Sequence, residues 1–233
     1  MIDADKVKAF WESRAKKLGD VAFESIVNLE EDEDALSEKI QVETKNVFDF
    51  LGDIQGKTII DLGAGIGQWA FRFQEQGAAM VTAVEYASNL VRIGSEEAAR
   101  RGITNVEFRT SPAETFNSER SYDIVYISGL FVYLNDDQVT ILMPRLKKML
   151  AVDGGILLLR DGTGDPVRHE INQEMSTHLG TEYSAIYRTR DEYLTLFSRI
   201  GLTCVRDKNM FPEGHPLNKY RETRLRLYRF EEN

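Results

Sequence analysis

The sequence predicts an α/β fold: a doubly wound, mostly parallel sheet of seven strands with helices on both faces. Three observations support this. From residue 58 onward, short apolar segments alternate with amphipathic ones, which is typical of consecutive strand-helix-strand units. A glycine-rich turn directly follows the first apolar segment. The chain has 233 residues, of which 42% are hydrophobic and 29% charged, enough to bury one substantial core.

Two helices are expected before the sheet. Residues 5–18 place apolar side chains at near-helical spacing and end before Gly19, and residues 36–52 repeat that spacing. Between them, the acidic run from Glu30 to Asp34 is expected to be a solvated, mobile loop. We therefore predict that residues 1–55 form a helical extension acting as a lid, with the acidic run as its hinge. Residues 56–233 are the predicted core of one domain overall.

The elements of the sheet follow in order. Strands are predicted at residues 58–62, 80–85, 106–110, 123–128 and 154–161, and helices at about 67–76, 87–102 and 136–150. Residues 162–189 are expected to be a long, less regular insertion that covers the substrate, followed by a helix over 190–201. The last two strands, residues 203–211 and 224–230, have connections suited to an antiparallel pair at the sheet edge.

Composition argues against several classes of partner. The net charge of −9 and the isoelectric point near 5.0 disfavour nucleic acid, and the basic residues of 224–230 are expected to form a solvated strand face that includes Tyr228. Cys204 is the only cysteine, so no internal disulfide is possible and no zinc-ligand spacing is found. No apolar segment has the length of a membrane span or signal peptide, which predicts a soluble cytoplasmic protein.

The glycine-rich turn, "DLGAGIGQ", narrows the choice of ligand. Glycine tolerates positive φ and lets a ligand approach the backbone, and the following helix offers free N–H groups. The dinucleotide fingerprint requires glycine at position 68, where Gln68 stands, so a nicotinamide dehydrogenase is disfavoured. A phosphate-binding P-loop requires lysine followed by serine or threonine, and neither is present.

Two acidic residues accompany the turn. Asp61 precedes the first glycine by two positions, at the mouth of the ligand site of an open α/β sheet. Glu85 ends the second strand, where its carboxylate can accept hydrogen bonds from both hydroxyls of a ribose. The same carboxylate would repel a 2′-phosphate, so the phosphorylated nicotinamide cofactor is not expected.

On these residues the chain resembles the class I S-adenosylmethionine-dependent methyltransferases of the small-molecule type, a Rossmann-like family. The resemblance runs from about residue 57 to 201 and rests mainly on "DLGAGIG" with Glu85. "TSPAETF" resembles the family's adenine loop with Pro112 in place of the usual acid, and "YDIVYISGLFVYLND" resembles its fourth-strand segment. The resemblance implies that S-adenosylmethionine is the cofactor, bound by Asp61, Gly63, Ala64, Gly65, Gly67, Glu85, Tyr86, Ala113, Glu114, Ser128, Gly129 and Phe131.

Methyl transfer from such a cofactor is an in-line displacement that depends mainly on positioning, and a base is needed only if the acceptor must lose a proton. The candidate catalytic residues are His169, His178, Tyr133 and Asp161. Either histidine could instead be a surface residue, and Asp161 could instead brace the turn after the fifth strand. The candidate substrate-binding residues are Trp11, Arg14, Arg160, Tyr183 and Arg188. Trp11 could also simply anchor its helix. No metal is expected.

The first functional hypothesis is methyl transfer to an oxygen or nitrogen of a small molecule, a natural-product or metabolic intermediate. A protein or RNA methyltransferase is the alternative enzyme, and it would show an open groove beside Phe131 and Tyr133. A protein that binds the cofactor without catalysis is the third possibility, and turnover separates it from the other two. The chain is expected to work as a monomer or homodimer without a membrane.

Overall fold

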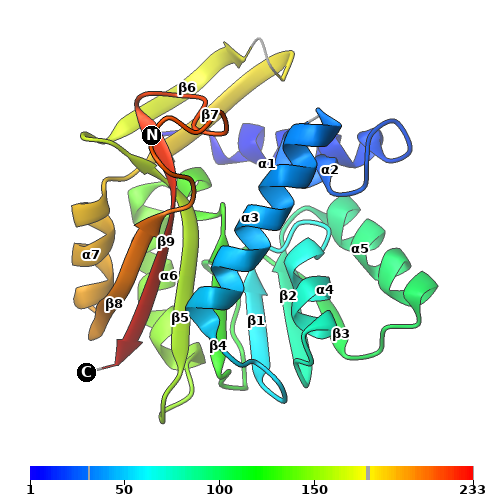
Figure 1. Cartoon of the computed structure of the whole chain (residues 1–233), viewed down its shortest axis with the longest axis vertical. Coiled ribbons are helices and arrows are strands. Elements are labelled where there is room, and N and C mark those ends of the chain that lie inside the picture. Colours follow the sequence, from blue (N-terminus) through cyan, green and yellow to red (C-terminus); the bar gives the residue numbers. More distant parts are fainter. Residues whose placement is uncertain (31, 177–178, 233) are drawn as a thin grey trace.

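The computed structural model of the protein describes residues 1–30, 32–176 and 179–232, and its centre is a seven-stranded sheet (Figure 1). The strands are β1 (Thr58–Leu62), β2 (Met80–Glu85), β3 (Val106–Thr110), β4 (Ile124–Ser128), β5 (Ile156–Gly164), β8 (Leu202–Asn209) and β9 (Thr223–Glu232). Their order across the sheet is β3-β2-β1-β4-β5-β9-β8. β1 to β5 are parallel, whereas β9 is antiparallel to both of its neighbours. The predicted sheet and its antiparallel edge pair are confirmed.

Helices cover both faces of this sheet. On one face lie α3 (Glu33–Leu51), α4 (Gln68–Glu75) and α5 (Ser88–Arg101), and on the other α6 (Asp136–Met149) and α7 (Arg190–Ser198) (Figure 1). Successive strand residues point to opposite faces. Accordingly, Ile59 packs with Phe50 and Phe73 of the first layer, whereas Ile60 packs with Leu142 and Phe197 of the second. The doubly wound arrangement is therefore built from two apolar clusters that meet at the sheet.

The acidic run corrects the sequence-based expectation. The Asp32 side chain accepts a hydrogen bond from the Ala35 N–H at 2.8 Å and so caps α3, and Glu33 and Asp34 lie in its first turn. Negative charge is favoured there because the free N–H groups of a helix N-terminus carry partial positive charge. Glu30 is buried and forms an ion pair with Lys219. The prediction of a loop is wrong for Glu33 and Asp34, which begin α3, although both are exposed as expected; the prediction of a solvated side chain is wrong for Glu30. Glu31 lies outside the described residues.

The insertion is a second correction. β5 continues to Gly164, and β6 (His169–Ser176) and β7 (Thr181–Tyr187) then pair as a separate antiparallel sheet. This hairpin lies over the carboxyl ends of the parallel strands, next to α1 (Ala4–Arg14) (Figure 1). Ile186 of β7 is buried against Ile2 and Val7. The expected irregular segment is thus an ordered hairpin whose apolar residues pack against the N-terminal helix.

The first N-terminal helix is shorter than predicted, whereas the second, α3, begins three residues earlier than predicted. α1 ends at Arg14, and a 3-10 helix η1 (Ala15–Lys17) and the short helix α2 (Ser25–Asn28) precede α3. The domain boundary at residue 55 stays a prediction.

At the other end of the chain, Tyr228 is fully buried, and its hydroxyl shares a 2.9 Å hydrogen bond with that of Thr163. The expectation that Tyr228 lies on a solvated face is therefore wrong. None of the helices in the described part of the chain has the length and apolar content needed to cross a bilayer.

Candidate active site

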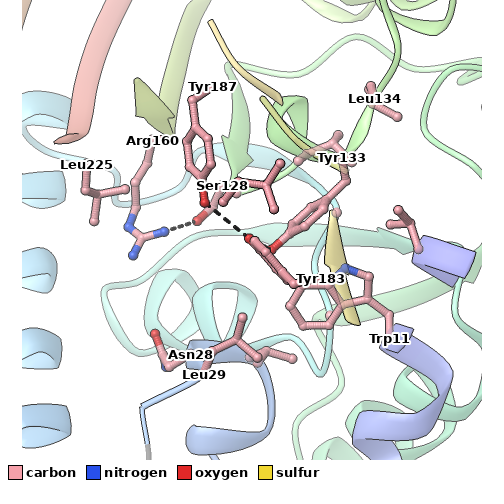
Figure 2. Close-up of a pocket in the computed structure, with 18 of the residues that line it drawn as sticks. Trp11, Asn28, Leu29, Ser128, Tyr133, Leu134, Arg160, Tyr183, Tyr187 and Leu225 are labelled. Carbon is pink, nitrogen blue, oxygen red and sulfur yellow. Dashed lines mark hydrogen bonds between the residues drawn. The ribbon is translucent and has the colours of Figure 1, made fainter. Parts of the chain in front are cut away.

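A cavity of about 740 Å³ lies at the carboxyl ends of β1, β2, β4 and β5, where open parallel sheets bind their ligands. It is walled by α1, α2 and the β6–β7 hairpin as well as by the strand ends (Figure 2). Most of the predicted site residues meet here: Trp11, Asp61, Gly63, Ala64, Gly65, Glu85, Tyr86, Ala113, Glu114, Ser128, Gly129, Tyr133, Arg160, His169 and Tyr183 all line it. Residues far apart in the sequence thus form one site.

The glycines of the turn have separable roles. Gly63 and Gly65 have positive φ values of 77° and 57° and line the cavity. A Cβ on Gly65 would lie 2.8 Å from Val27 Cγ1, so this position has no room for a side chain. Gly67 does not line the cavity, and a Cβ there would lie 2.4 Å from the Phe108 ring. The first two glycines therefore expose backbone to a ligand, and the third allows α4 to pack closely.

Glu85 connects the glycine turn to the end of β2. Its Oε2 accepts a hydrogen bond from the Gly65 N–H at 3.0 Å, and its Oε1 accepts one from the Ala87 N–H at 2.8 Å. Burial raises the pKa of this carboxyl to about 7, although the backbone N–H groups oppose the shift. Each carboxylate oxygen can accept more than one hydrogen bond. Glu85 can therefore position the turn and still receive two ribose hydroxyls from the cavity.

Asp61 is a buried carboxyl group that lacks protein partners. Its exposed fraction is 1%, and neither oxygen has a hydrogen-bond partner among the described residues. Burial, together with the nearby Glu85, raises the pKa of Asp61 to about 8. An unpaired buried carboxyl is costly, and a site for a cationic or N–H donor ligand explains its retention. A cofactor with both a ribose and an ammonium group, such as S-adenosylmethionine, fits Glu85 and Asp61.

The Glu85 carboxylate offers the most direct test of this cofactor site. We expect Glu85→Ala to raise the dissociation constant for S-adenosylmethionine at least tenfold, about 1.4 kcal/mol, because both hydrogen bonds to the ribose and the support of Gly65 are lost. Calorimetric titration measures the effect, and NAD is expected not to bind the wild type. Glu96→Ala is the matched control, because that carboxylate lies on the exposed face of α5. An unchanged dissociation constant in Glu85→Ala would contradict this assignment.

The adenine side of the cavity follows β3. Ala113 and Glu114 line it, and Glu114 Oε1 accepts a hydrogen bond from Gln138 Nε2 at 2.8 Å. The Pro112 carbonyl accepts hydrogen bonds from the Thr115 and Phe116 N–H groups, so the substituted residue shapes this turn through its backbone. Although Pro112 replaces the acid that the family usually has, the loop at the place expected for the adenine is held by hydrogen bonds to the Pro112 carbonyl.

Three tyrosine hydroxyls form a connected group on the opposite wall (Figure 2). The Tyr133 and Tyr183 oxygens are 2.9 Å apart and those of Tyr183 and Tyr187 3.4 Å, and the Trp11 ring contacts Tyr133 edge-on with centroids 5.3 Å apart. Burial raises the pKa of all three tyrosines well above the ordinary value. They are therefore neutral at physiological pH and offer hydrogen bonds and aromatic faces. The His169 ring stacks on Tyr187, with centroids 5.9 Å apart.

Two of the predicted substrate anchors lie outside the cavity. Arg14 is buried and donates to the backbone carbonyls of Ser25 and Ile26 at 2.8 and 2.9 Å, which holds α1 against α2. Arg188 has an exposed fraction of 1% and donates to the carbonyls of Phe131 and Leu134 at 2.7 and 2.8 Å. Both guanidinium groups bind backbone, and this placement contradicts the predicted contact with substrate.

Asp161 and Phe131 also require correction. The Asp161 carboxylate accepts hydrogen bonds from the Phe131 and Gly162 N–H groups, each at 2.8 Å, and does not line the cavity. Asp161 therefore fits the alternative prediction, in which it braces the turn after β5, because its two carboxylate oxygens hold the backbone of Phe131 and Gly162 next to the cavity. Phe131 is fully buried within the α6 and α7 cluster, and Leu130 lines the cavity instead. His178 lies outside the described residues, so its predicted role stays a prediction.

Several residues of the cavity wall were not found by sequence reasoning. Asn28, Lys39, Gln68 and Lys219 line the cavity from α2, α3, α4 and the segment before β9. Asn28 Nδ2 donates to Gln68 Oε1 at 2.8 Å, so α2 lies directly over the start of α4. These residues have no common motif, and only tertiary packing brings them together. The described residues contain no cluster of three or more His, Cys, Asp or Glu side chains that could hold a metal ion.

Comparisons with known proteins support a methyltransferase domain. Residues 59–154 match the methyltransferase domain family. Phosphoethanolamine N-methyltransferase 1 of Triticum aestivum is 31% identical over 155 residues, covering 65% of this chain and 29% of that protein. A malonyl-[acyl-carrier protein] O-methyltransferase of Bacillus cereus is 28% identical over 118 residues, covering 50% of this chain and 40% of that protein. The chain thus spans less than half the length of either relative.

A solved structure shares the fold over nearly the whole chain. It is Haemonchus contortus phosphoethanolamine N-methyltransferase 1 in complex with phosphoethanolamine and S-adenosylhomocysteine. The TM-score is 0.73 at 19% sequence identity, and the match covers 97% of this chain and 48% of that one. Sheet order, glycine turn and acidic partners agree with the domain match, and residues 59–154 resemble the methyltransferase domain of class I S-adenosylmethionine-dependent methyltransferases.

Proposed function

We propose that the protein transfers a methyl group from S-adenosylmethionine to a nitrogen of a small molecule. The observation that carries this proposal is the walled cavity: Tyr133, Tyr183 and Tyr187, whose hydroxyls contact one another, line it together with the predicted cofactor residues. The bound cofactor supplies the activated methyl group. The protein holds donor and acceptor in line and excludes water, a contribution that can reach about 7–11 kcal/mol. The predicted cytoplasmic location, and a monomer or homodimer as the working form, belong to the same proposal.

The chemistry of the tyrosine wall favours nitrogen. Neutral phenols accept hydrogen bonds from an amine N–H and orient its lone pair, and the faces of Trp11 and the tyrosines stabilise the positive charge that nitrogen gains. No strong base is required for an acceptor that arrives as the free amine. The names of the phosphoethanolamine N-methyltransferases among its relatives support the same acceptor atom.

Oxygen is the second candidate, because the relatives include a malonyl-[acyl-carrier protein] O-methyltransferase and a carboxylate acceptor also needs no base. A protein or RNA acceptor is less favoured, since α1 and the β6–β7 hairpin wall the cavity beside Tyr133. The test is formation of S-adenosylhomocysteine with a panel of acceptors: ethanolamine, phosphoethanolamine, malonyl esters, a peptide and an RNA. Turnover with amines alone supports the proposal. Binding of the cofactor without turnover on any acceptor would favour the non-catalytic alternative.

Tyr183→Phe tests the role of the tyrosine wall. The hydroxyl lies between those of Tyr133 and Tyr187, so its loss interrupts both contacts. We expect kcat/KM for the acceptor to fall about tenfold, or 1.4 kcal/mol, while the dissociation constant for S-adenosylmethionine is unchanged. Tyr122→Phe is the matched control, because its hydroxyl contacts Ser118 and Thr82 away from the cavity. A variant with unaltered kcat/KM would show that the hydroxyl does not contact the acceptor.

A further inference from the structure

Three cationic side chains line the cavity from α3, β5 and the segment before β9. Lys39 comes from α3, Arg160 from the end of the parallel part of β5, and Lys219 from the segment before β9. Two of the three have carboxylate partners: Arg160 Nη2 lies 2.5 Å from Glu43 Oε1, and Lys219 Nζ lies 2.5 Å from Glu30 Oε2. These two pairs cancel in charge.

Lys39 has a different environment. Its Nζ donates to the Asn28 carbonyl at 3.0 Å, and none of the described carboxylates lies within ion-pair distance of it. Burial lowers the pKa of the Lys39 ammonium, Glu43 opposes this shift, and Arg160 adds to it. An ammonium group has three donors, so two remain available. Lys39 is therefore the uncompensated charge of this wall.

Arg160 brings a second cationic group to the same region. Its exposed fraction is 8%, and its Nη1 donates to Ser128 Oγ at 2.9 Å (Figure 2). Its Nε is buried and has no partner among the described residues. The Arg160 guanidinium and the Lys39 ammonium both line the cavity, and an anion held between them would satisfy the free Lys39 donors, which are costly to leave unpaired.

We propose that Lys39 and Arg160 form a subsite for an oxyanion, a carboxylate or a phosphate, that belongs to the acceptor. This inference rests on the proposed function, since it specifies which acceptors enter the same cavity. The acceptor is the source because Arg160 lies on β5, two strands from the glycine turn of β1, and is bonded to Ser128 at the end of β4. Charge-assisted hydrogen bonds from two cations give such a group both affinity and orientation.

The subsite and the tyrosine wall together define the acceptor class. An amine that also carries an acid group would place the acid against Lys39 and Arg160 and the nitrogen near the tyrosine hydroxyls. A neutral or purely cationic amine would leave Lys39 uncompensated. The protein should therefore discriminate strongly between an amine and the same amine carrying a phosphate or carboxylate.

The test uses binding, so that it does not depend on turnover. Inorganic phosphate and malonate are titrated into the full chain loaded with S-adenosylhomocysteine. The proteins compared are wild type, Lys39→Met, Lys39→Arg and the control Lys45→Met, whose ammonium is exposed on the same helix. We expect Lys39→Met to weaken binding of at least one anion about tenfold or more, Lys39→Arg to restore most of it, and Lys45→Met to match the wild type.

A second pair of titrations identifies the source of the anion. S-Adenosylhomocysteine has an amino-acid carboxylate, and 5′-methylthioadenosine does not. If Lys39→Met weakens binding of the former but not of the latter, the cation serves the cofactor and the proposal is overturned. Equal anion binding by wild type and Lys39→Met also overturns it. Failure of the proposed function has a different signature, because anion binding would then persist in a protein that methylates no amine.

Discussion

Arg188→Met is expected to lower the free energy of unfolding by about 3 kcal/mol, because it removes charge-assisted hydrogen bonds to two buried carbonyls. The guanidinium donates to Phe131 and Leu134, and its ion pair with Asp136 adds little because that carboxylate is 65% exposed. Methionine fills most of the volume of the arginine side chain. The lower free energy of unfolding would therefore reflect lost hydrogen bonds more than a new cavity. Urea denaturation measures it directly.

The same substitution should affect the site. The carbonyl of Phe131 begins the short helix η2 (Phe131–Tyr133), which positions Tyr133 on the cavity wall. Arg92→Met is the control, because this arginine is exposed on α5 and pairs with Glu96, and we expect its effect to stay within about 0.5 kcal/mol. If Arg188→Met were as stable as Arg92→Met, the buried arginine would not be a structural support.

Asp61→Asn is expected to stabilise the ligand-free protein at high pH and to weaken cofactor binding. The folded-state pKa of Asp61, about 8, lies above the ordinary value of 3.8. The folded state therefore gains stability from the protonated carboxyl below pH 4, and this contribution is lost as the pH rises through 8. Asparagine stays neutral throughout. At pH 9 we expect the variant to be more stable by about 2 kcal/mol, and near pH 4 the two proteins should be similar.

Thermal denaturation between pH 4 and 9 measures this effect, and about 2 kcal/mol corresponds to roughly 4–8 °C for a chain of this size. Calorimetric titration should show affinity for S-adenosylmethionine reduced at least about tenfold, because a buried carboxylate at the cavity wall becomes a neutral amide. Asp153→Asn, in an exposed turn before β5, is the control for both measurements. An Asp61→Asn protein that is less stable than the wild type at pH 9 would contradict the assignment.

The sequence by itself determined the elements whose signals are local. The alternation of apolar segments with helices placed β1 to β5 and the helices between them, because periodicity reports which face of each element is buried. The glycine turn, Asp61 and Glu85 were also identifiable, since a ligand site at the end of a parallel strand needs backbone access and acidic partners at fixed spacing. The family could therefore be inferred before any contact was known.

Other residues could be assigned only from the tertiary structure, because their roles depend on partners distant in the chain. Arg14 and Arg188 have the chemistry of substrate anchors, yet they bind backbone carbonyls, since packing directs them away from the cavity. The acidic run looked like a solvated loop, but Asp32 caps α3 and Glu30 is buried in an ion pair with Lys219, which lies far away in the sequence. Lys39 has no sequence signal at all. Its importance arises because α3 crosses the sheet beside Arg160, which makes a cation on an ordinary helix part of the active site.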